Sequence, residues 1–194
     1  TSGEASAKNL SDFLGRVRSA PNRMSFASSG NGTFTHLYGE LFNLSAGVKL
    51  LHVPYKGSTQ ALADVMSGTV DVAFSPATPV MGLVHAGKLK VLGVIGRSRM
   101  NEWPEVPTLA QAGIVGFESA LWFGLNAPAG TPPEVTQKII QDVQWAMSLA
   151  DIQTQLVSKG IQPLPMGQAS FQEVIQREHA QWIRVIKQTG IKAD

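Results

Sequence analysis

Hydrophobic residues in the first half of the chain alternate between helical spacing and strand spacing. A helix that starts at Asn9 or Ser11 is expected first, because the apolar residues that follow lie on one helical face and Pro21 ends the run. The alternation then continues and predicts an α/β domain with a mostly parallel sheet that is covered on both faces. Strands are expected at residues 24–27, 50–55, 70–74 and 89–95, and helices over the stripe Phe34, Leu37, Leu41 and Leu44, over 59–67, and after Pro79 as far as Gly87.

Beyond Gly96 the pattern changes and the expected elements are mostly helices. A short helix over residues 108–112 stops at Gly113, and a hydrophobic strand is expected over residues 120–126. Two capping boxes predict helix starts further on. They are Thr131 to Glu134, with proline at the first helical position, and Ser170 to Glu173. The first helix has an apolar face of Val135, Ile139, Val143 and Met147, and the second has one of Phe171, Ile175, Trp182 and Ile186. A shorter helix is expected between them, over residues 151–158.

Composition narrows the classes of protein that this sequence can represent. Hydrophobic residues make up 43% of the chain and charged residues 15%, which excludes a disordered chain. The net charge is +2 and the lysines and arginines are dispersed, so we do not expect a nucleic-acid partner. The sequence contains no cysteine, which excludes disulfides and thiolate metal sites. No apolar run is long enough to span a membrane.

Three loops that each lead from a strand into a helix carry the candidate binding residues. Ligands of open α/β sheets bind at the carboxyl ends of the strands, where helix N-termini favour negative charge. In the first loop two glycines let the backbone approach a ligand, the second loop adds an aromatic ring and a cation, and the third is rigid and uncharged. The candidates are Ser28, Ser29, Gly30, Asn31, Gly32, Thr33 and His36 for the first loop, Tyr55, Lys56, Gly57 and Ser58 for the second, and Ser75 for the third.

Each of these loops also has a purely structural interpretation. The first is equally consistent with a tight turn and a helix cap, and the lysine of the second is more often a solvated surface charge. The third loop fits a pocket floor or a plain turn. His36 lies one helical turn after Thr33, where it either donates a hydrogen bond to a carboxylate or has a capping or core role.

The sequence argues against an enzyme. A dinucleotide-binding loop needs a third glycine after Gly30 and Gly32 and an acidic residue near position 55, where this chain has Tyr55 and Lys56. There is no G-x-S-x-G nucleophile motif and no pair of carboxylates close to the loops. No two histidines have the spacing of metal ligands. Hydrogen-bond donors without a base therefore predict a binding protein with no cofactor and no metal.

The order of the motifs resembles the Bug-type, or TctC-like, solute-binding proteins of tripartite tricarboxylate transporters. The resemblance runs along nearly the whole chain and rests on Ser28 to Thr33 with His36, Val53 to Ser58, Gly87 to Leu89, Val106 to Gly113, and Ala127 to Pro132. It implies a periplasmic Venus-flytrap protein that holds a small carboxylate between two α/β domains, largely through backbone amides, and delivers it to the membrane subunits of the transporter. The ligands that it implies are di- or tricarboxylates or acidic amino acids. Because the sequence begins at Thr1, any signal peptide is expected to have been removed or never included.

The resemblance also implies a domain division and a missing part. Residues 1–118 correspond to the second, ligand-binding domain of the family, and residues 119–194 to the returning, mostly helical portion of the first domain. Roughly the N-terminal third of the family pattern is absent, and Ser75 stands where many relatives carry an acidic residue. Apolar faces that include Val135, Ile139, Trp182 and Ile186 would then lie exposed at a high cost in free energy. We therefore expect a second polypeptide fragment, an intertwined homo-oligomer or altered packing.

Two other functions are compatible with the same residues. A ligand-sensing domain would use the same cleft to report a carboxylate to a signalling partner, and a sensor kinase encoded next to it would favour that function. A nucleotide-dependent enzyme is the third hypothesis, and saturable binding of NADP but not of dicarboxylates would support it.

Overall fold

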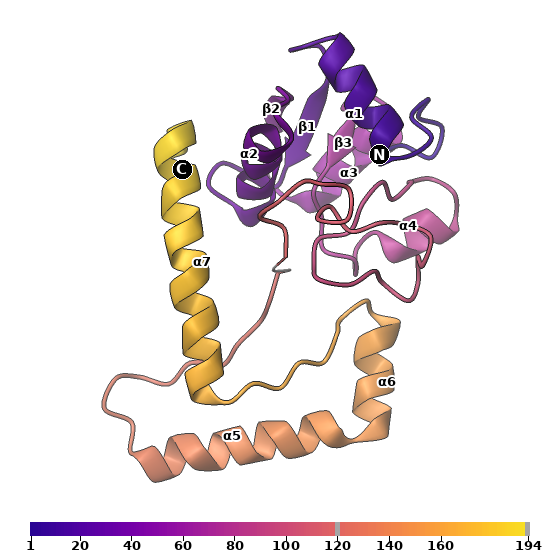
Figure 1. The fold of residues 1–194 in the computed structure, drawn as a ribbon. Helices are drawn as coiled ribbons and strands as arrows, with labels where there is room; N and C mark the ends of the chain where they lie inside the picture. The colour runs from indigo at the N-terminus through magenta and orange to yellow at the C-terminus, as the bar shows by residue number, and fades with distance from the viewer. Residues whose placement is uncertain (119–120, 193–194) are drawn as a thin grey trace. The chain divides into compact units, whose positions relative to one another are not determined.

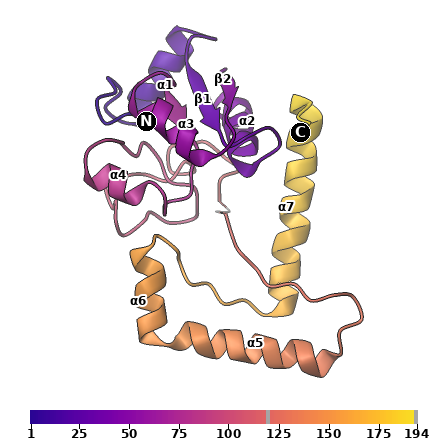
Figure 2. The same ribbon diagram turned by 180° about the vertical axis from the view of Figure 1, so that it is seen from behind.

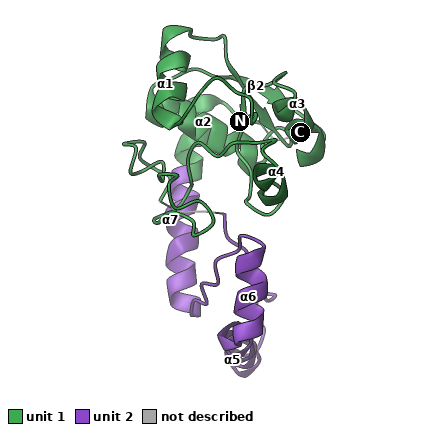
Figure 3. Cartoon of the chain, turned by 90° about the vertical axis from the view of Figure 1, so that its right-hand side faces the viewer, with its two compact units in different colours: residues 1–120, 182–194 green, residues 121–181 purple. Residues whose placement is uncertain are grey.

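The computed structural model describes residues 1–118 and 121–192. The chain divides into two compact units (Figure 3). Unit 1 comprises residues 1–120 and 182–194, and unit 2 comprises residues 121–181. The predicted boundary after residue 118 falls next to residues 119–120, which lie outside the described residues.

Unit 1 is built on a parallel three-stranded sheet, so the predicted α/β class is confirmed (Figure 1). The strands are β1 (Ser25–Ser28), β2 (Leu51–Pro54) and β3 (Val72–Ala73), in the order β2-β1-β3. In the register of β1 with β2, Ser28 lies opposite Pro54, and in that of β1 with β3, Ala27 lies opposite Ala73. All three strands therefore end at the same edge of the sheet.

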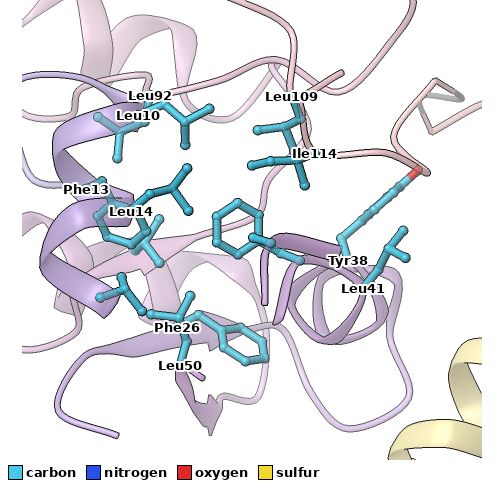
Figure 4. Packing of buried hydrophobic residues seen from close by; sticks show 14 of the residues in the cluster. Leu10, Phe13, Leu14, Phe26, Tyr38, Leu41, Leu50, Leu92, Leu109 and Ile114 are labelled. Carbon is cyan, nitrogen blue, oxygen red and sulfur yellow. The ribbon is translucent and has the colours of Figure 1, made fainter. Parts of the chain in front are cut away.

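Helices cover both faces of this sheet, as the strand pattern predicts. They are α1 (Leu10–Ser19), α2 (Phe34–Ala46), α3 (Ser58–Met66) and α4 (Met81–His85). Successive residues of a strand point to opposite faces. Phe26 accordingly packs in the core cluster with α1 and α2 (Figure 4), whereas Ala27 packs in a second cluster with α3.

The contact between α2 and β1 is unusually close because α2 has a glycine where it crosses the strand. The Phe26 ring is 0% exposed. A Cβ atom built on Gly39 would lie 2.1 Å from that ring, a distance that no side chain tolerates. Burial of a phenylalanine contributes about 1.5–3 kcal/mol relative to its exposure to water. Gly39 therefore brings α2 close enough to β1 to complete the core.

Several predicted elements of unit 1 differ in the structure. Residues 89–95, all of which the structure describes, form no fourth strand of the sheet; Leu89 makes a single bridge to Ser2, and Val94 makes one to Thr108. The segment 108–112 forms hydrogen-bonded turns and is not assigned as a helix. In α2, Leu44 is 45% exposed, so its place on the predicted apolar stripe does not bury it. The buried face of α2 runs instead through Thr35, His36, Tyr38, Gly39, Leu41, Phe42 and Ala46.

Unit 2 contains α5 (Pro133–Ser148), α6 (Ala150–Ser158) and the first part of α7 (Gln168–Thr189). The chain turns sharply between α5 and α6 (Figure 2). The indole N–H of Trp122 donates a hydrogen bond of 2.8 Å to Glu178, and its ring packs edge-on against Phe171. The predicted strand over residues 120–126 is not formed in the part that the structure describes, 121–126, and Ala120 lies outside it.

Both predicted capping boxes are wrong. The hydroxyl of Thr131 donates to the Pro128 carbonyl, and α5 begins at Pro133 after Pro132, with no side-chain cap among the described residues. Proline at the first helical position is confirmed. The last helix begins at Gln168, before Ser170, so that serine lies inside α7 rather than at its cap. By contrast, α6 starts within one residue of its expected position.

The apolar faces of unit 2 remain exposed. Among the residues that the structure describes, neither α5 nor α6 has a buried side chain. In α7, Val185 is buried in the core of unit 1, and Trp182 packs against Tyr38 with ring centroids 5.1 Å apart. Large apolar side chains that stay exposed in unit 2 are Leu121, Trp122, Phe123, Leu125, Val135, Ile139, Trp145, Val157, Leu164, Met166 and Ile175. Within residues 1–118 and 121–192, no helix combines the length and hydropathy of a membrane span.

Candidate functional site

The loops that follow β1 and β2 lie side by side. Ser28 and Pro54 are register partners, and the backbone N–H of Tyr55 donates a hydrogen bond of 3.0 Å to the carbonyl of Ser28. A Cβ atom on Gly30 would lie 3.5 Å from the carbonyl oxygen of Tyr55. The third loop follows β3 at the same edge, and the hydroxyl of Ser75 donates to the Pro76 carbonyl. The structure thus brings together the three loops that sequence analysis singled out.

The first loop is held by hydrogen bonds within itself. The hydroxyl of Ser28 donates to the carbonyl of Gly30 over 3.2 Å, and the hydroxyl of Thr33 donates to the same carbonyl over 2.7 Å. The backbone N–H of Ser29 donates to the Thr35 hydroxyl at 2.9 Å, and the Ser29 hydroxyl lies 3.0 Å from the same oxygen. Three candidate hydroxyls therefore shape the loop in this structure.

Thr35 is a residue that sequence analysis missed. Its hydroxyl oxygen lies within hydrogen-bond distance of Ser29 and, at 2.9 Å, of the Thr33 hydroxyl. The side chain is buried although it lies in the first turn of α2. Only the observation that the loop folds back onto this turn could have identified it, because nothing in its spacing distinguishes it from a helical surface residue.

The first turns of α2 and α3 supply backbone N–H groups as hydrogen-bond donors. The first N–H groups of any α-helix have no partner within the helix. Within the described residues, neither Thr33 at the start of α2 nor Gly57 at the start of α3 makes a side-chain cap. Both starts follow strands that end at the same sheet edge, so two positive helix ends lie near each other. This arrangement suits a negatively charged group.

The second loop contributes a fixed ring and a free backbone turn. The Tyr55 hydroxyl donates a hydrogen bond of 2.6 Å to Asp64 in α3, and this bond, with burial second, raises the pKa of Tyr55 to about 12. The tyrosine is thereby fixed as a neutral wall. Gly57 has a φ of +131°, which only glycine adopts without strain, and Lys56 and Ser58 are exposed.

His36 and His52 form a stacked pair next to the first loop. Their ring centroids are 3.7 Å apart, with an interplanar angle of 13°. The backbone N–H of Gly32 donates to Nδ1 of His36 over 3.2 Å, and Nε2 of His52 lies 2.6 Å from the Ser28 hydroxyl. Burial lowers the pKa of both histidines, that of His52 to about 4, with His36 as the second cause. The pairing of β1 with β2 brings His52 to Ser28, a contact that their separation in the sequence does not reveal.

Two cavities of unit 1 lie away from the candidate site. A cavity of about 240 Å³ is lined by residues that include Val84, Gly87 and Trp103. A second cavity, of about 310 Å³, is lined by residues that include Ser2 and Met66. Residues of the three loops line neither of these cavities. Of the residues that the structure describes, no three potential metal ligands form a group.

Comparison with known proteins identifies the family of this chain. The model of the TctC family, described as the tripartite tricarboxylate transporter family receptor, matches residues 2–191. A protein from the tcbD-tcbE intergenic region of Pseudomonas sp. strain P51 is 33% identical over 96% of this chain, and BugT of Bordetella pertussis is 27% identical over 95% of it.

Solved structures share the fold. The structure of Rpa4515 from R. palustris with adipate matches 98% of this chain with a TM-score of 0.84 and 29% identity. That of MatC from Rhodopseudomonas palustris with bound malate matches 95% with a TM-score of 0.77 and 27% identity. The periplasmic binding protein BugD matches all of the chain with a TM-score of 0.81 and 27% identity. The predicted periplasmic-binding-protein-like fold is thus confirmed.

This chain spans only part of its relatives. It covers 56% of the Pseudomonas protein and 56% of BugT, and 64% of the Rpa4515 chain. The match nevertheless extends over almost every residue of this chain, in sequence and in fold. The chain therefore belongs to the tripartite tricarboxylate transporter receptor family.

Proposed function

We propose that this chain forms one wall of the carboxylate site of a periplasmic solute-binding protein. The protein captures a small di- or tricarboxylate or an acidic amino acid without transforming it, and delivers it to the membrane subunits of a tripartite tricarboxylate transporter. Membership of the receptor family supports this, as do the relatives whose structures contain adipate and malate.

The observation that carries the proposal is the pair of helix starts at one sheet edge. Within the described residues, α2 and α3 both begin without a side-chain cap, directly after the adjacent parallel strands β1 and β2. Unpaired backbone N–H groups at such ends bind carboxylates without a positively charged side chain. The proposed wall consists of the loop 28–33 with His36, the loop 55–58, and Ser75 at the third loop.

The domain division is proposed on the same basis. Residues 1–118 correspond to the ligand-binding domain of the family, and residues 119–194 to the returning portion of the other domain. The division of the described chain near residue 120, and the helical character of α5 and α6, support this assignment for residues 121–181, whereas the end of α7, from Trp182, groups with unit 1.

We also propose that the exposed apolar faces of unit 2 are covered by a complementary polypeptide. This polypeptide corresponds to the part of the relatives that this chain does not span. The absence of buried side chains among the described residues of α5 and α6 supports it, because a domain needs a packed core to be stable. An intertwined homo-oligomer is the alternative way to cover these faces.

The carboxylate site is tested by removing one backbone donor. Ser58 is the first residue of α3, a position that accepts proline, and Ser58→Pro deletes a single N–H group while keeping the helix. Loss of one hydrogen bond to a charged group costs about 1.5–3 kcal/mol, so malate or adipate should bind about ten- to a hundredfold more weakly by calorimetry.

The matched control is Ser58→Ala, which keeps the N–H group and loses the hydroxyl. It should retain the affinity of the unmodified chain to within about threefold, since the hydroxyl is exposed. Equal affinities for the proline and alanine variants, or no binding of either acid by the unmodified chain, would contradict the proposed wall. Thermal unfolding of both variants serves as the control that the fold is intact.

A further inference from the structure

The stacked histidines are connected to the loop that the proposed function uses. His36 lies in α2 and is 8% exposed. Its Nδ1 atom accepts the hydrogen bond from Gly32, and its ring lies on the ring of His52 from β2. His52 also stacks on Phe26 of β1, with ring centroids 4.9 Å apart. The pair therefore joins the loop to the buried side of the sheet.

The hydrogen bonds fix the protonation state of His36. A backbone N–H group can only donate, so the Nδ1 atom that accepts from Gly32 carries no proton, and the proton of the neutral ring is on Nε2. Nε2 of His52 lies 2.6 Å from the Ser28 hydroxyl, and burial of the His52 ring favours its neutral form by lowering its pKa. Both rings therefore hold the loop in their neutral forms.

Protonation of His36 opposes this arrangement in two ways. The new proton on Nδ1 would point at the N–H group of Gly32, so that two donors face each other. The positive charge would also lie in a buried site, stacked on the ring of His52. Glu40, whose Oε1 atom lies 4.0 Å from Nε2 of His36, favours the charge, and the neighbouring ring of Phe26 on β1 does not titrate. Burial outweighs Glu40, and the pKa of His36 is lowered.

We propose that His36 is a positioning residue whose neutral ring holds the Gly30–Gly32 turn, so that protonation of this ring releases the turn and weakens carboxylate binding. The binding half of this inference rests on the proposed function. The positioning half does not, because it concerns contacts within the chain alone. The carboxylate would consequently be held most firmly near neutral pH and released on acidification.

The positioning half is tested by NMR on the unliganded chain. His36 should be the Nε2–H tautomer at pH 7, and the pKa of its ring should lie below the ordinary histidine value of 6.5 because the ring is buried. The amide resonance of Gly32 should move with the same apparent pKa as His36. A His36 ring that titrates at or above pH 6.5, or a Gly32 amide resonance that does not move while His36 titrates, would overturn the inference.

The binding half is tested with His36→Asn. The amide oxygen of asparagine takes the place of Nδ1 and accepts from Gly32, but it does not titrate. Malate affinity of the unmodified chain should fall more steeply below pH 6.5 than that of the variant, by at most about tenfold per pH unit. The titration of malate itself cancels in this comparison. His85→Asn is the matched control and should leave the pH profile unchanged.

The two sets of results separate the two claims. If the NMR behaviour is found but malate and adipate do not bind, the proposed function fails and the positioning role stands. If malate binds the unmodified chain and His36→Asn with identical pH profiles, binding stands and the proton-linked release is wrong.

Discussion

At the scale of single residues, two helical glycines should respond to alanine with opposite signs. Gly39 in α2 faces the Phe26 ring, where an added Cβ atom has no room, and Gly39→Ala should destabilise the fold by about 1–3 kcal/mol through overpacking. Gly15 in α1 has no atom within 4 Å of an added Cβ atom, and Gly15→Ala should stabilise by about 0.5–1 kcal/mol. Urea unfolding of both variants measures the difference, and a shift of the same sign in both would refute this account of the α2–β1 contact.

A second prediction at this scale is that burial of His52 makes the fold less stable at acidic pH. Its pKa is about 4 in the folded chain, against an ordinary value of 6.5. Between these values the unfolded chain binds more protons than the folded chain, so stability is greatest above pH 6.5 and falls as the pH decreases toward 4. Urea unfolding at pH 7 and pH 4.5 should therefore show a larger loss for the unmodified chain than for His52→Gln. The exposed His85→Gln is the control and should behave like the unmodified chain; a loss in His52→Gln as large as in that control would contradict the prediction.

The residues of the candidate site could be predicted only in part from the sequence. The loops 28–33 and 55–58 were recognisable because strand spacing ends and helical spacing begins around them. The partners that shape these loops were not. His52 reaches Ser28 only through the parallel register of β1 with β2, and Thr35 reaches Ser29 because the loop folds back on its own helix. Such contacts depend on three-dimensional pairing that one sequence does not contain.

At the scale of elements, helix capping separates two neighbouring candidates. The Asn9 side chain accepts a hydrogen bond of 2.9 Å from the N–H group of Asp12, whereas Ser11 lies inside α1. Asn9→Ala should therefore cost about 1 kcal/mol of stability. Ser11→Ala should leave stability unchanged or slightly raised, since alanine is the better helix former. Thermal or urea unfolding distinguishes the two variants. A larger loss of stability for Ser11→Ala than for Asn9→Ala would show that Asn9 is not the N-cap of α1.

The helices were more predictable than the strands and the caps. An apolar stripe with a cap and a stop signal predicted α1 closely, and α6 starts within one residue of its expected position. The apolar run 89–95 looks like a strand because its residues pack inward, yet its backbone bonds to Thr1 and Pro107 instead of β3. Apolar spacing reports burial, and burial alone does not determine which backbone is the partner.

At the scale of the whole molecule, the two units differ in how well their apolar residues are packed. Unit 1 has two clusters of buried side chains around its sheet. In unit 2, Trp145 is 67% exposed, and the described parts of α5 and α6 bury nothing. The resemblance predicted this contrast, because the faces of Val135 and Ile139 were expected to pack against the part of the relatives that this chain does not span. Exposed apolar side chains that are clustered in this way favour association with another polypeptide.

The last prediction is that a polypeptide equivalent to the unmatched part of the relatives binds the apolar faces of unit 2. Size-exclusion chromatography with intact-mass analysis should show a one-to-one complex, and the fluorescence of exposed Trp145 should shift to shorter wavelength on mixing. Burial of an isoleucine contributes about 1.5–3 kcal/mol, so Ile139→Glu should weaken the complex at least about tenfold.

Gln137 provides the matched control because it lies on the same helix and is also exposed. Gln137→Glu adds the same charge without removing an apolar side chain, so the complex should persist. Self-association of the chain that excludes the added polypeptide would identify an intertwined homo-oligomer as the occupant instead. A stable monomer of 20.7 kDa that neither associates nor binds a hydrophobic dye would contradict both occupants, because its exposed apolar side chains would then carry no measurable cost.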